Sequence, residues 1–234
     1  MTDKITGLIL AGGVGTRMRP FTLNAPKILI PVCGRPFLDL QLELFAKNGV
    51  ESVVLSTGYL GYKIEDYLET HDTYGIEVNV CHEKEPLGTG GAIINSLPLL
   101  PDEFFLAYGD SYFLQPIPAA YLAFKKSGKS ALATVMRQHD GTSENNCDVR
   151  NGMVVRYKKG MPAGTFEYIE YGLLFFKKQA LLNYQCKSFP TDAILLDLIA
   201  KRQLAAFETN KPYYEVGSTE GLLKLEERIR GGLA

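Results

Sequence analysis

The chain has 234 residues and a formal net charge of −1, which suits one large α/β domain or two small ones and gives no electrostatic reason to expect a nucleic-acid partner. Its hydrophobic content of 46% is ordinary for a globular core, and no run approaches the ~18 consecutive apolar residues of a membrane span. The first residues lack a signal-peptide layout and the four cysteines form no CxxC pair. We therefore expect no zinc cluster, no disulfide framework and a reducing, cytoplasmic location.

The first half of the chain alternates short apolar runs with amphipathic stretches. This pattern predicts strands at residues 5–10, 52–56, 76–81 and 104–108, helices at 36–48, 62–69 and 90–96, and a short extended run at 27–32. Strands that alternate with helices indicate a parallel sheet with crossover helices. Ligands bind at the carboxyl ends of the strands in such sheets. The glycine-rich segment after the first strand and Asp110 after the fourth are therefore expected to meet in one cleft.

The second half has a different pattern, with shorter strands between polar segments. Asn151-Gly152 lies between two short apolar runs and predicts a hairpin within residues 148–155. Further strands are expected at 130–137, 167–176 and 213–217, helices at about 178–183, 191–202 and 219–230, and loops at 139–146 and 158–164. No repeat, low-complexity tract or linker interrupts the chain, so residues 1–234 are expected to form a single domain.

The most informative segment is Ala11-Gly12-Gly13-Val14-Gly15-Thr16, directly after the first strand. Its three glycines let the backbone turn sharply, and successive N–H groups can then hold an anion. Arg17, Arg19 and Lys27 follow, and this positive charge suits a triphosphate. The segment lacks the Gly-Lys-Ser/Thr ending of a P-loop, and Met18 stands where a dinucleotide fingerprint needs its third glycine. The glycines alone are also compatible with a tight strand-to-helix turn.

The longer string GGxGTRxxPxTxxxPK, over residues 12–27, closely resembles the sugar-1-phosphate nucleotidyltransferases. The resemblance implies an α/β fold: a Rossmann-like mixed, mainly parallel sheet flanked by helices, nucleotidyltransferase or glycosyltransferase-A-like, with a small β-rich sugar-binding part. It implies a nucleotide half at about residues 1–115 and a sugar-phosphate half at about 116–234. It also implies that Arg17 and Lys27 contact the phosphates at the reacting centre. The residues that it places around the nucleotide are Leu10, Ala11, Gly12, Gly13, Gly15 and Thr16.

Asp110 follows the fourth predicted strand and is a candidate ligand for Mg²⁺, which prefers oxygen ligands. A turn or helix-capping role is the alternative. In the resembled family this aspartate binds the metal together with a second aspartate in a D-x-G-T-like segment near the C-terminus. The matching segment here, residues 214–219, has Glu215 in place of that aspartate. Three possibilities stay open for Glu215: it binds the metal directly, it binds the metal through a water, or it has no metal role.

The run EKEPLGTGGAI, at residues 83–93, corresponds to the family's loop along the base and ribose. Guanine has donors at N1 and N2, and the carboxylate of Glu83 or Glu85 can accept from both, which favours GTP. Solvated glutamates, or glutamates paired with Lys84, are the alternative. The resemblance adds Pro86, Gly88 and Thr89 to the nucleotide-binding residues. The run looks most like the guanylyltransferases that act on a heptose 1-phosphate, although mannose-1-phosphate guanylyltransferases and N-acetylmuramate-1-phosphate uridylyltransferases have similar loops.

The sugar-phosphate half carries a weaker resemblance. Glu170 and Gly172 lie in a segment similar to the family's sugar-contacting strand, and Gly109, next to Asp110, is placed in the same group. Lys158 and Lys159 lie near the lysine with which the family holds the sugar phosphate. The local pattern departs from the family's Glu-Lys-Pro, so the choice between the two lysines stays open, as does a solvated hairpin end.

The resemblance implies transfer of a nucleotidyl group from a nucleoside triphosphate, GTP favoured, to a sugar 1-phosphate, heptose 1-phosphate favoured, with Mg²⁺ as cofactor and pyrophosphate as product. Mannose-1-phosphate guanylyl transfer and uridylyl transfer to N-acetylmuramate or hexose 1-phosphate are the alternatives within the class. The unusual Glu215 allows a different class, a catalytically inactive regulatory protein that binds sugar nucleotides. A nicotinamide-dependent oxidoreductase would need the missing fingerprint. No nucleic-acid or membrane partner is expected, and a homodimer is compatible with the sequence.

Overall fold

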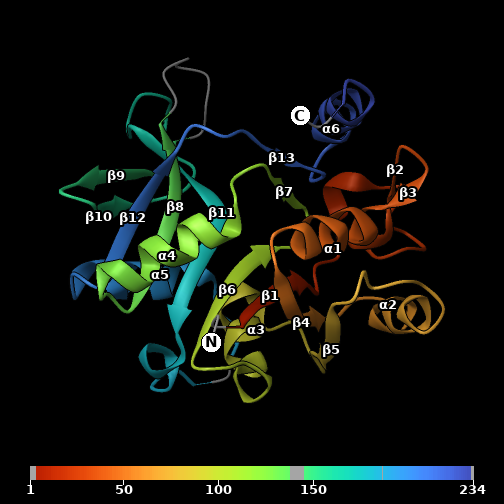
Figure 1. The fold of residues 1–234 in the computed structure, drawn as a ribbon, viewed down its shortest axis with the longest axis horizontal. Helices are drawn as coiled ribbons and strands as arrows, with labels where there is room; N and C mark the ends of the chain where they lie inside the picture. Colours follow the sequence, from red (N-terminus) through yellow and green to blue (C-terminus); the bar gives the residue numbers. More distant parts are fainter. Residues whose placement is uncertain (1–3, 138–144, 186, 233–234) are drawn as a thin grey trace.

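The structure, a computed structural model, describes residues 4–137, 145–185 and 187–232 and contains a large mixed sheet (Figure 1). β1 is parallel to β4 and β6, and β4 is parallel to β5, as the alternation in the first half predicts. β11 is antiparallel to both β6 and β8, and it joins the two halves of the sheet. In the order in which they lie side by side, the strands are β5 (Glu77–His82), β4 (Val50–Thr57), β1 (Ile5–Ala11), β6 (Glu103–Tyr108), β11 (Tyr168–Lys177), β8 (Ala131–Arg137), β12 (Leu204–Thr209), β10 (Met153–Tyr157) and β9 (Cys147–Arg150).

Two apolar cores pack against opposite faces of this sheet. Neighbouring residues of a strand point to opposite faces. Phe105 of β6 and Phe175 of β11 therefore belong to one core, whereas Phe104 and Phe176 belong to the other. The first core includes buried residues of α1 and α4, and the second those of α3 and α5, so helices cover both faces (Figure 1). The helices are α1 (Phe37–Lys47), α2 (Gly61–Leu68), α3 (Gly88–Ser96), α4 (Ile117–Ser127), α5 (Thr191–Ala200) and α6 (Thr219–Arg230).

The four parallel strands of the first half end at one edge of the sheet. Ala11 at the end of β1 pairs with Thr57 of β4, Thr57 pairs with His82 of β5, and Leu10 pairs with Tyr108 of β6. The segments that follow these strands must therefore emerge side by side. They are the glycine-rich loop, Gly58-Tyr59, residues 83–87 and Gly109-Asp110.

Several predicted elements are confirmed and others need correction. The Asn151-Gly152 hairpin forms between β9 and β10, with φ of 52° and 71° at the two residues, as a type I′ turn requires. The extended run expected at 27–32 is wrong at its start, because Lys27–Leu29 form a 3₁₀ turn and only Pro31–Val32 (β2) is a strand, paired with Arg35–Pro36 (β3). Most of the loop expected at 139–146 lies outside the described residues.

Three elements are not predicted by the sequence patterns. α4 has prolines just before and within its first turn, which obscure its helical pattern although proline is tolerated there. β12 extends the sheet parallel to β8. β7 (Ser111–Phe113) pairs with β13 (Tyr213–Glu215) in a separate two-stranded sheet. None of the helices within the described ranges is long and apolar enough to cross a membrane.

Candidate active site

The glycine-rich loop and the end of the strand before it lie so close to Gly58 and Gly109 that these two positions have no space for a side chain. The Gly109 N–H donates to the Leu10 carbonyl at 2.9 Å, and a Cβ on Gly109 would lie 2.6 Å from that oxygen. A Cβ on Gly58 would lie 2.9 Å from the Gly12 carbonyl. Gly15 has a φ of +63°, which favours glycine, and its carbonyl accepts from Thr22 Oγ1 at 2.8 Å. The motif threonine at Thr22 therefore fixes the turn of the loop.

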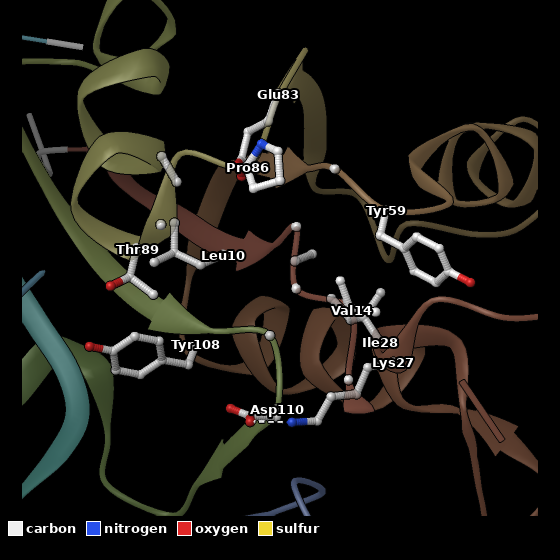
Figure 2. A pocket seen from close by; sticks show the side chains of 18 of the residues that line it. Leu10, Val14, Lys27, Ile28, Tyr59, Glu83, Pro86, Thr89, Tyr108 and Asp110 are labelled. Atoms are coloured by element: carbon white, nitrogen blue, oxygen red, sulfur yellow. Dashed lines mark hydrogen bonds and ion pairs between the residues drawn. The ribbon is translucent and has the colours of Figure 1, made fainter. Parts of the chain in front are cut away.

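A cavity of about 730 Å³ opens at this edge of the sheet (Figure 2). Glu83 and Pro86 lie at one end of it, and Lys27 and Asp110 lie at the other. The predicted residues that line it are Leu10, Ala11, Gly12, Gly13, Gly15, Thr16, Arg17, Lys27, Glu83, Glu85, Pro86, Gly88, Thr89, Gly109 and Asp110. The predicted residues that do not line it are Glu215, Lys158, Lys159, Glu170 and Gly172.

The sequence analysis missed several lining residues, among them Gly58, Tyr59, Tyr108 and Gly217. Gly58 and Tyr59 directly follow β4, so the rule that ligands bind at strand carboxyl ends could have found them. Tyr108 is the last residue of β6 and could have been found in the same way. Gly217 comes from the distant C-terminal part of the chain, within the segment 214–219 that matches the family's D-x-G-T-like pattern, and that match could have found it.

Positive and negative groups converge at the lower end of the cavity in Figure 2. Lys27 Nζ donates to Asp110 Oδ2 at 2.5 Å, and both side chains are largely buried (17% and 22% exposed). A Cβ placed on Gly217 would lie 3.4 Å from Asp110 Oδ2, 3.4 Å from Lys27 Nζ and 3.5 Å from Arg17 Nη2. The structure therefore brings Arg17, Lys27 and Asp110 together around one small glycine.

The pairing of β7 with β13 places Glu215 next to this group. Glu215 lies opposite Ser111, and the N–H of Val216 donates to the Asp110 carbonyl at 2.8 Å. Glu215 keeps an exposed surface, yet loss of surrounding water raises the pKa of its carboxyl. The negative charge of Asp110 raises that pKa further, whereas Lys27 and Arg17 lower it. Two carboxylates that repel each other beside a cavity form a donor set that suits Mg²⁺.

The donor set for such an ion is incomplete in protein groups alone. Within the described ranges, no group of three or more His, Cys, Asp or Glu side chains could hold a metal ion. Mg²⁺ commonly binds through one or two carboxylates, with phosphate oxygens and waters as its other ligands. Asp110 and Glu215 therefore fit a magnesium ion that arrives with a triphosphate.

Glu83 connects the loop at residues 83–87 to the glycine-rich loop. Its Oε1 accepts from Ser56 Oγ at 3.2 Å, and its Oε2 accepts from the Leu87 N–H at 3.2 Å. A Cβ on Gly12 would clash with Glu83 Oε1, so the loop backbone rests against this carboxylate. Glu85, in contrast, has an exposed side chain at the cavity mouth. Of the two candidate glutamates, Glu83 is the one that is held in a fixed orientation.

In the second half of the chain, Glu170 is buried (8% exposed) in β11. Its Oε1 accepts from the Gly172 N–H at 2.6 Å, where the pairing of β11 with β8 shifts register and Gly172 has a φ of +81°. Burial raises the pKa of the Glu170 carboxyl to about 7; Lys159 and the Gly172 N–H lower this pKa, while Asp192 and Glu215 raise it. Both lysines are exposed, but Lys159 Nζ lies 3.2 Å from Asp192 Oδ1 and interacts with the Glu170 carboxyl. The contacts therefore favour Lys159 over Lys158 as a substrate ligand.

Replacing Glu170 with glutamine is expected to make stability less dependent on pH. A carboxyl whose pKa is raised from 4.5 to about 7 by folding contributes stability below pH 4.5 that is lost as the pH rises through 7. At about 1.4 kcal/mol per pH unit, wild type should lose about 3 kcal/mol of unfolding free energy between pH 5 and pH 8 that Glu170→Gln does not lose. Urea unfolding at the two pH values measures this difference.

Glu167→Gln is the matched control for this prediction. Hydrogen bonding to Arg150 lowers the pKa of the Glu167 carboxyl, so its contribution changes only below pH 4.5. If the unfolding free energies of wild type and Glu170→Gln changed equally between pH 5 and pH 8, Glu170 would already be charged at pH 5.

Comparison with known proteins identifies the family. The chain matches the family described as Nucleotidyl transferase over residues 6–230, a range that includes every residue that lines the cavity. The chain belongs to the nucleotidyl transferase family. The family assignment agrees with the resemblance that the sequence string over residues 12–27 carries.

The chain is similar to two guanylyltransferases and to one solved structure with a bound nucleotide analogue. The catalytic subunit beta of mannose-1-phosphate guanylyltransferase from Xenopus tropicalis is 29% identical over 223 residues, 92% of this chain and 62% of that protein. D-glycero-alpha-D-manno-heptose 1-phosphate guanylyltransferase from Campylobacter jejuni is 30% identical over 176 residues, 75% of this chain and 72% of that protein. The crystal structure of HddC from Yersinia pseudotuberculosis complexed with GMP-PN has a TM-score of 0.80 at 27% identity and covers 96% of this chain and 99% of that one. The chain thus spans about three fifths of the length of the mannose-1-phosphate relative.

Proposed function

We propose that the chain transfers a guanylyl group from GTP to a sugar 1-phosphate and releases pyrophosphate. The observation that carries this proposal is the convergence of Arg17, Lys27 and Asp110 at one end of the glycine-walled cavity. An oxygen of the sugar phosphate attacks the α-phosphorus of GTP, and the bond from that phosphorus to the bridging oxygen of pyrophosphate breaks. Such transfer depends mainly on positioning and on neutralising phosphate charge.

Each charged group at this end has a distinct task in the proposal. Arg17 stabilises the triphosphate and the departing pyrophosphate. Lys27 leaves Asp110 and bridges the phosphates of the two substrates, because a lysine ammonium has three donors on a flexible stem. Asp110 and Glu215 hold Mg²⁺, which when bound neutralises phosphate charge. Glutamate is unusual at this position in the resembled family. The strand pairing that sets Glu215 beside Asp110 supports its role as a metal ligand.

Glu83 is the residue from which we assign the base, and Glu170 and Lys159 are the residues that we assign to the sugar 1-phosphate. The fixed carboxylate of Glu83 lies at the opposite end of the cavity from Lys27 and Asp110 in Figure 2. It can accept hydrogen bonds from guanine N1 and N2. The similar proteins include two guanylyltransferases, which supports guanine as the base. Glu170 and Lys159 contact the sugar and its phosphate. We propose heptose 1-phosphate as the acceptor and mannose 1-phosphate as the alternative. The cytoplasmic location expected from the sequence stays a prediction, and a homodimer stays compatible with the sequence.

The proposal is tested by pyrophosphate release with Mg²⁺, in a panel that crosses GTP, UTP, CTP and dTTP with heptose, mannose, glucose and N-acetylated sugar 1-phosphates. The fastest release is expected with GTP and a heptose 1-phosphate. Faster release with another pair would retain the mechanism and change the substrates. No release with any pair, together with tight nucleotide binding, would favour the inactive regulatory protein instead.

Replacing Glu83 with glutamine tests how the base is recognised. GTP and ITP differ only in the 2-amino group, so the ratio of their kcat/KM values reports hydrogen bonds to that group. A hydrogen bond to a charged acceptor contributes ~1.5–3 kcal/mol, so the GTP preference should fall at least about tenfold in Glu83→Gln. Any general loosening of the loop affects both nucleotides equally and cancels in the ratio. Glu85→Gln is the control and should keep the wild-type ratio; an unchanged ratio in Glu83→Gln would assign base recognition to other groups.

A further inference from the structure

Asp192 has no assigned role, yet it links the sugar-phosphate side of the site to helix α5. It lies in the first turn of α5, and its side chain is 30% exposed. Asp192 Oδ1 forms an ion pair with Lys159 Nζ at 3.2 Å and accepts a hydrogen bond from the Tyr157 hydroxyl at 3.4 Å. Tyr157 is the last residue of β10, so one carboxylate oxygen joins the end of this strand, the loop after it and the start of the helix.

The Lys159 ammonium lies at the border between the two sides of the site. It is 5.9 Å from the ring centroid of Tyr108 and 5.9 Å from that of Tyr157. Tyr108 lines the nucleotide cavity, and Lys159 is close enough to Glu170 to lower the pKa of that buried carboxyl. The ammonium thus lies close both to a residue that lines the cavity and to the buried carboxylate of Glu170.

We infer that Asp192 is a positioning residue, which holds the Lys159 ammonium ready for the phosphate of the incoming sugar 1-phosphate. The inference rests on the proposed function and adds a residue that acts through Lys159. A lysine ammonium has three donors, and the ion pair with Asp192 leaves donors available for phosphate oxygens. Fixing a long side chain before the substrate arrives removes part of the ordering cost of binding. The faces of the Tyr108 and Tyr157 rings also attract the same ammonium.

The exposure of this ion pair argues against a purely structural role. The Lys159 side chain is 52% exposed, and pairs with this much solvent contribute little to the stability of a fold. The Asp192→Asn variant is therefore expected to fold and melt as wild type does. Its defect should be confined to binding of the sugar 1-phosphate.

The same helix offers a matched control in Asp197. Its carboxylate accepts from Lys201 Nζ at 2.7 Å and from the Tyr184 hydroxyl at 2.7 Å, so it has the same kinds of partner as Asp192. Like Asp192 and Lys159, Asp197 and its two partners do not line the cavity, but unlike Asp192 and Lys159 they are not among the groups that shift the pKa of Glu170. Asp197→Asn removes an equivalent carboxylate, one that contacts a lysine and a tyrosine, at a place where no substrate is expected.

The test measures KM and kcat for both substrates, together with sugar 1-phosphate binding by calorimetry in the presence of a non-hydrolysable GTP analogue. Asp192→Asn should raise both the KM and the Kd of the sugar 1-phosphate about 5–10-fold, with kcat and the KM of GTP within about twofold of wild type. Asp197→Asn should match wild type. In a Lys159→Met background, Asp192→Asn should add almost nothing, because both changes remove the same contact.

Four other results would contradict the role of Asp192, the proposed function or both. A wild-type Kd in Asp192→Asn, or a full additional loss in the Lys159→Met background, would overturn the role of Asp192. Wild-type binding of the sugar 1-phosphate without any pyrophosphate release would overturn the proposed function and leave the calorimetric test of Asp192 in place. Absence of sugar 1-phosphate binding in wild type would overturn both.

Discussion

Replacing Lys27 with alanine is expected to lower the rate of pyrophosphate release about 10²–10³-fold while the protein stays folded. The Lys27 ammonium is the cationic partner of Asp110, at 2.5 Å, and lies around Gly217 together with Arg17. In the reaction it neutralises phosphate charge where the two substrates meet, and preorganised charge of this kind acts mainly on the transition state. The loss should therefore fall on kcat. Stopped-time assays of pyrophosphate release under saturating substrates measure it.

Two further variants make the Lys27 prediction specific. Lys63→Ala is the control, because Lys63 Nζ donates to the Asn24 carbonyl at 2.6 Å and so supports the same segment without reaching the phosphates. It should keep turnover within a few-fold of wild type. Lys27→Arg keeps the charge but changes its shape, and partial activity is expected. Near-normal turnover in Lys27→Ala would remove Lys27 from the mechanism.

Replacing Asp110 with asparagine is expected to lower turnover at least as much as loss of Lys27, and to raise the Mg²⁺ concentration needed for half-maximal rate. Asparagine has nearly the same shape but no charge, so the change removes the anionic partner of Lys27 and one of two proposed metal ligands together. A loss of about 10³-fold is expected at low Mg²⁺, with partial recovery as Mg²⁺ rises. Titration of activity with Mg²⁺ measures both effects.

Asp102→Asn is the control for this variant. Asp102 lies just before β6, at the amino end of the strand whose carboxyl end carries Asp110. It should show wild-type turnover and the wild-type Mg²⁺ requirement. An unchanged Mg²⁺ requirement in Asp110→Asn would show that the ion is held by other groups.

The nucleotide side of the site could be predicted from the sequence because its chemistry is local. The glycines, Thr22 and Lys27 are close together in the chain, and their string is restrictive enough to indicate the family by itself. Asp110 could be added because strand alternation predicts that parallel strands end at one edge. The structure confirms that edge through the pairing of β1 with β4 and β6.

The rest of the site depends on contacts that no local pattern shows. Glu215 reaches Asp110 through β7 and β13, two strands of three residues each, and the first of them is too short to be predicted from its residues. Glu170 is turned inward at a register shift that centres on Gly172, a feature of strand pairing. Asp192 stands in the first turn of a helix, where an acidic residue is ordinary, so the sequence offers no reason to single it out.

The most direct test of the central claim follows the α-phosphate of GTP. Protein is incubated with Mg²⁺, GTP labelled at the α-phosphorus and a heptose 1-phosphate, and the products are separated. Guanylyl transfer predicts that the label appears in a GDP-sugar and that pyrophosphate forms in equal amount, with Lys27→Ala as the inactive comparison. Label that stays in GTP across all sugar 1-phosphates, or that moves to GMP or GDP without a sugar, would contradict the assignment.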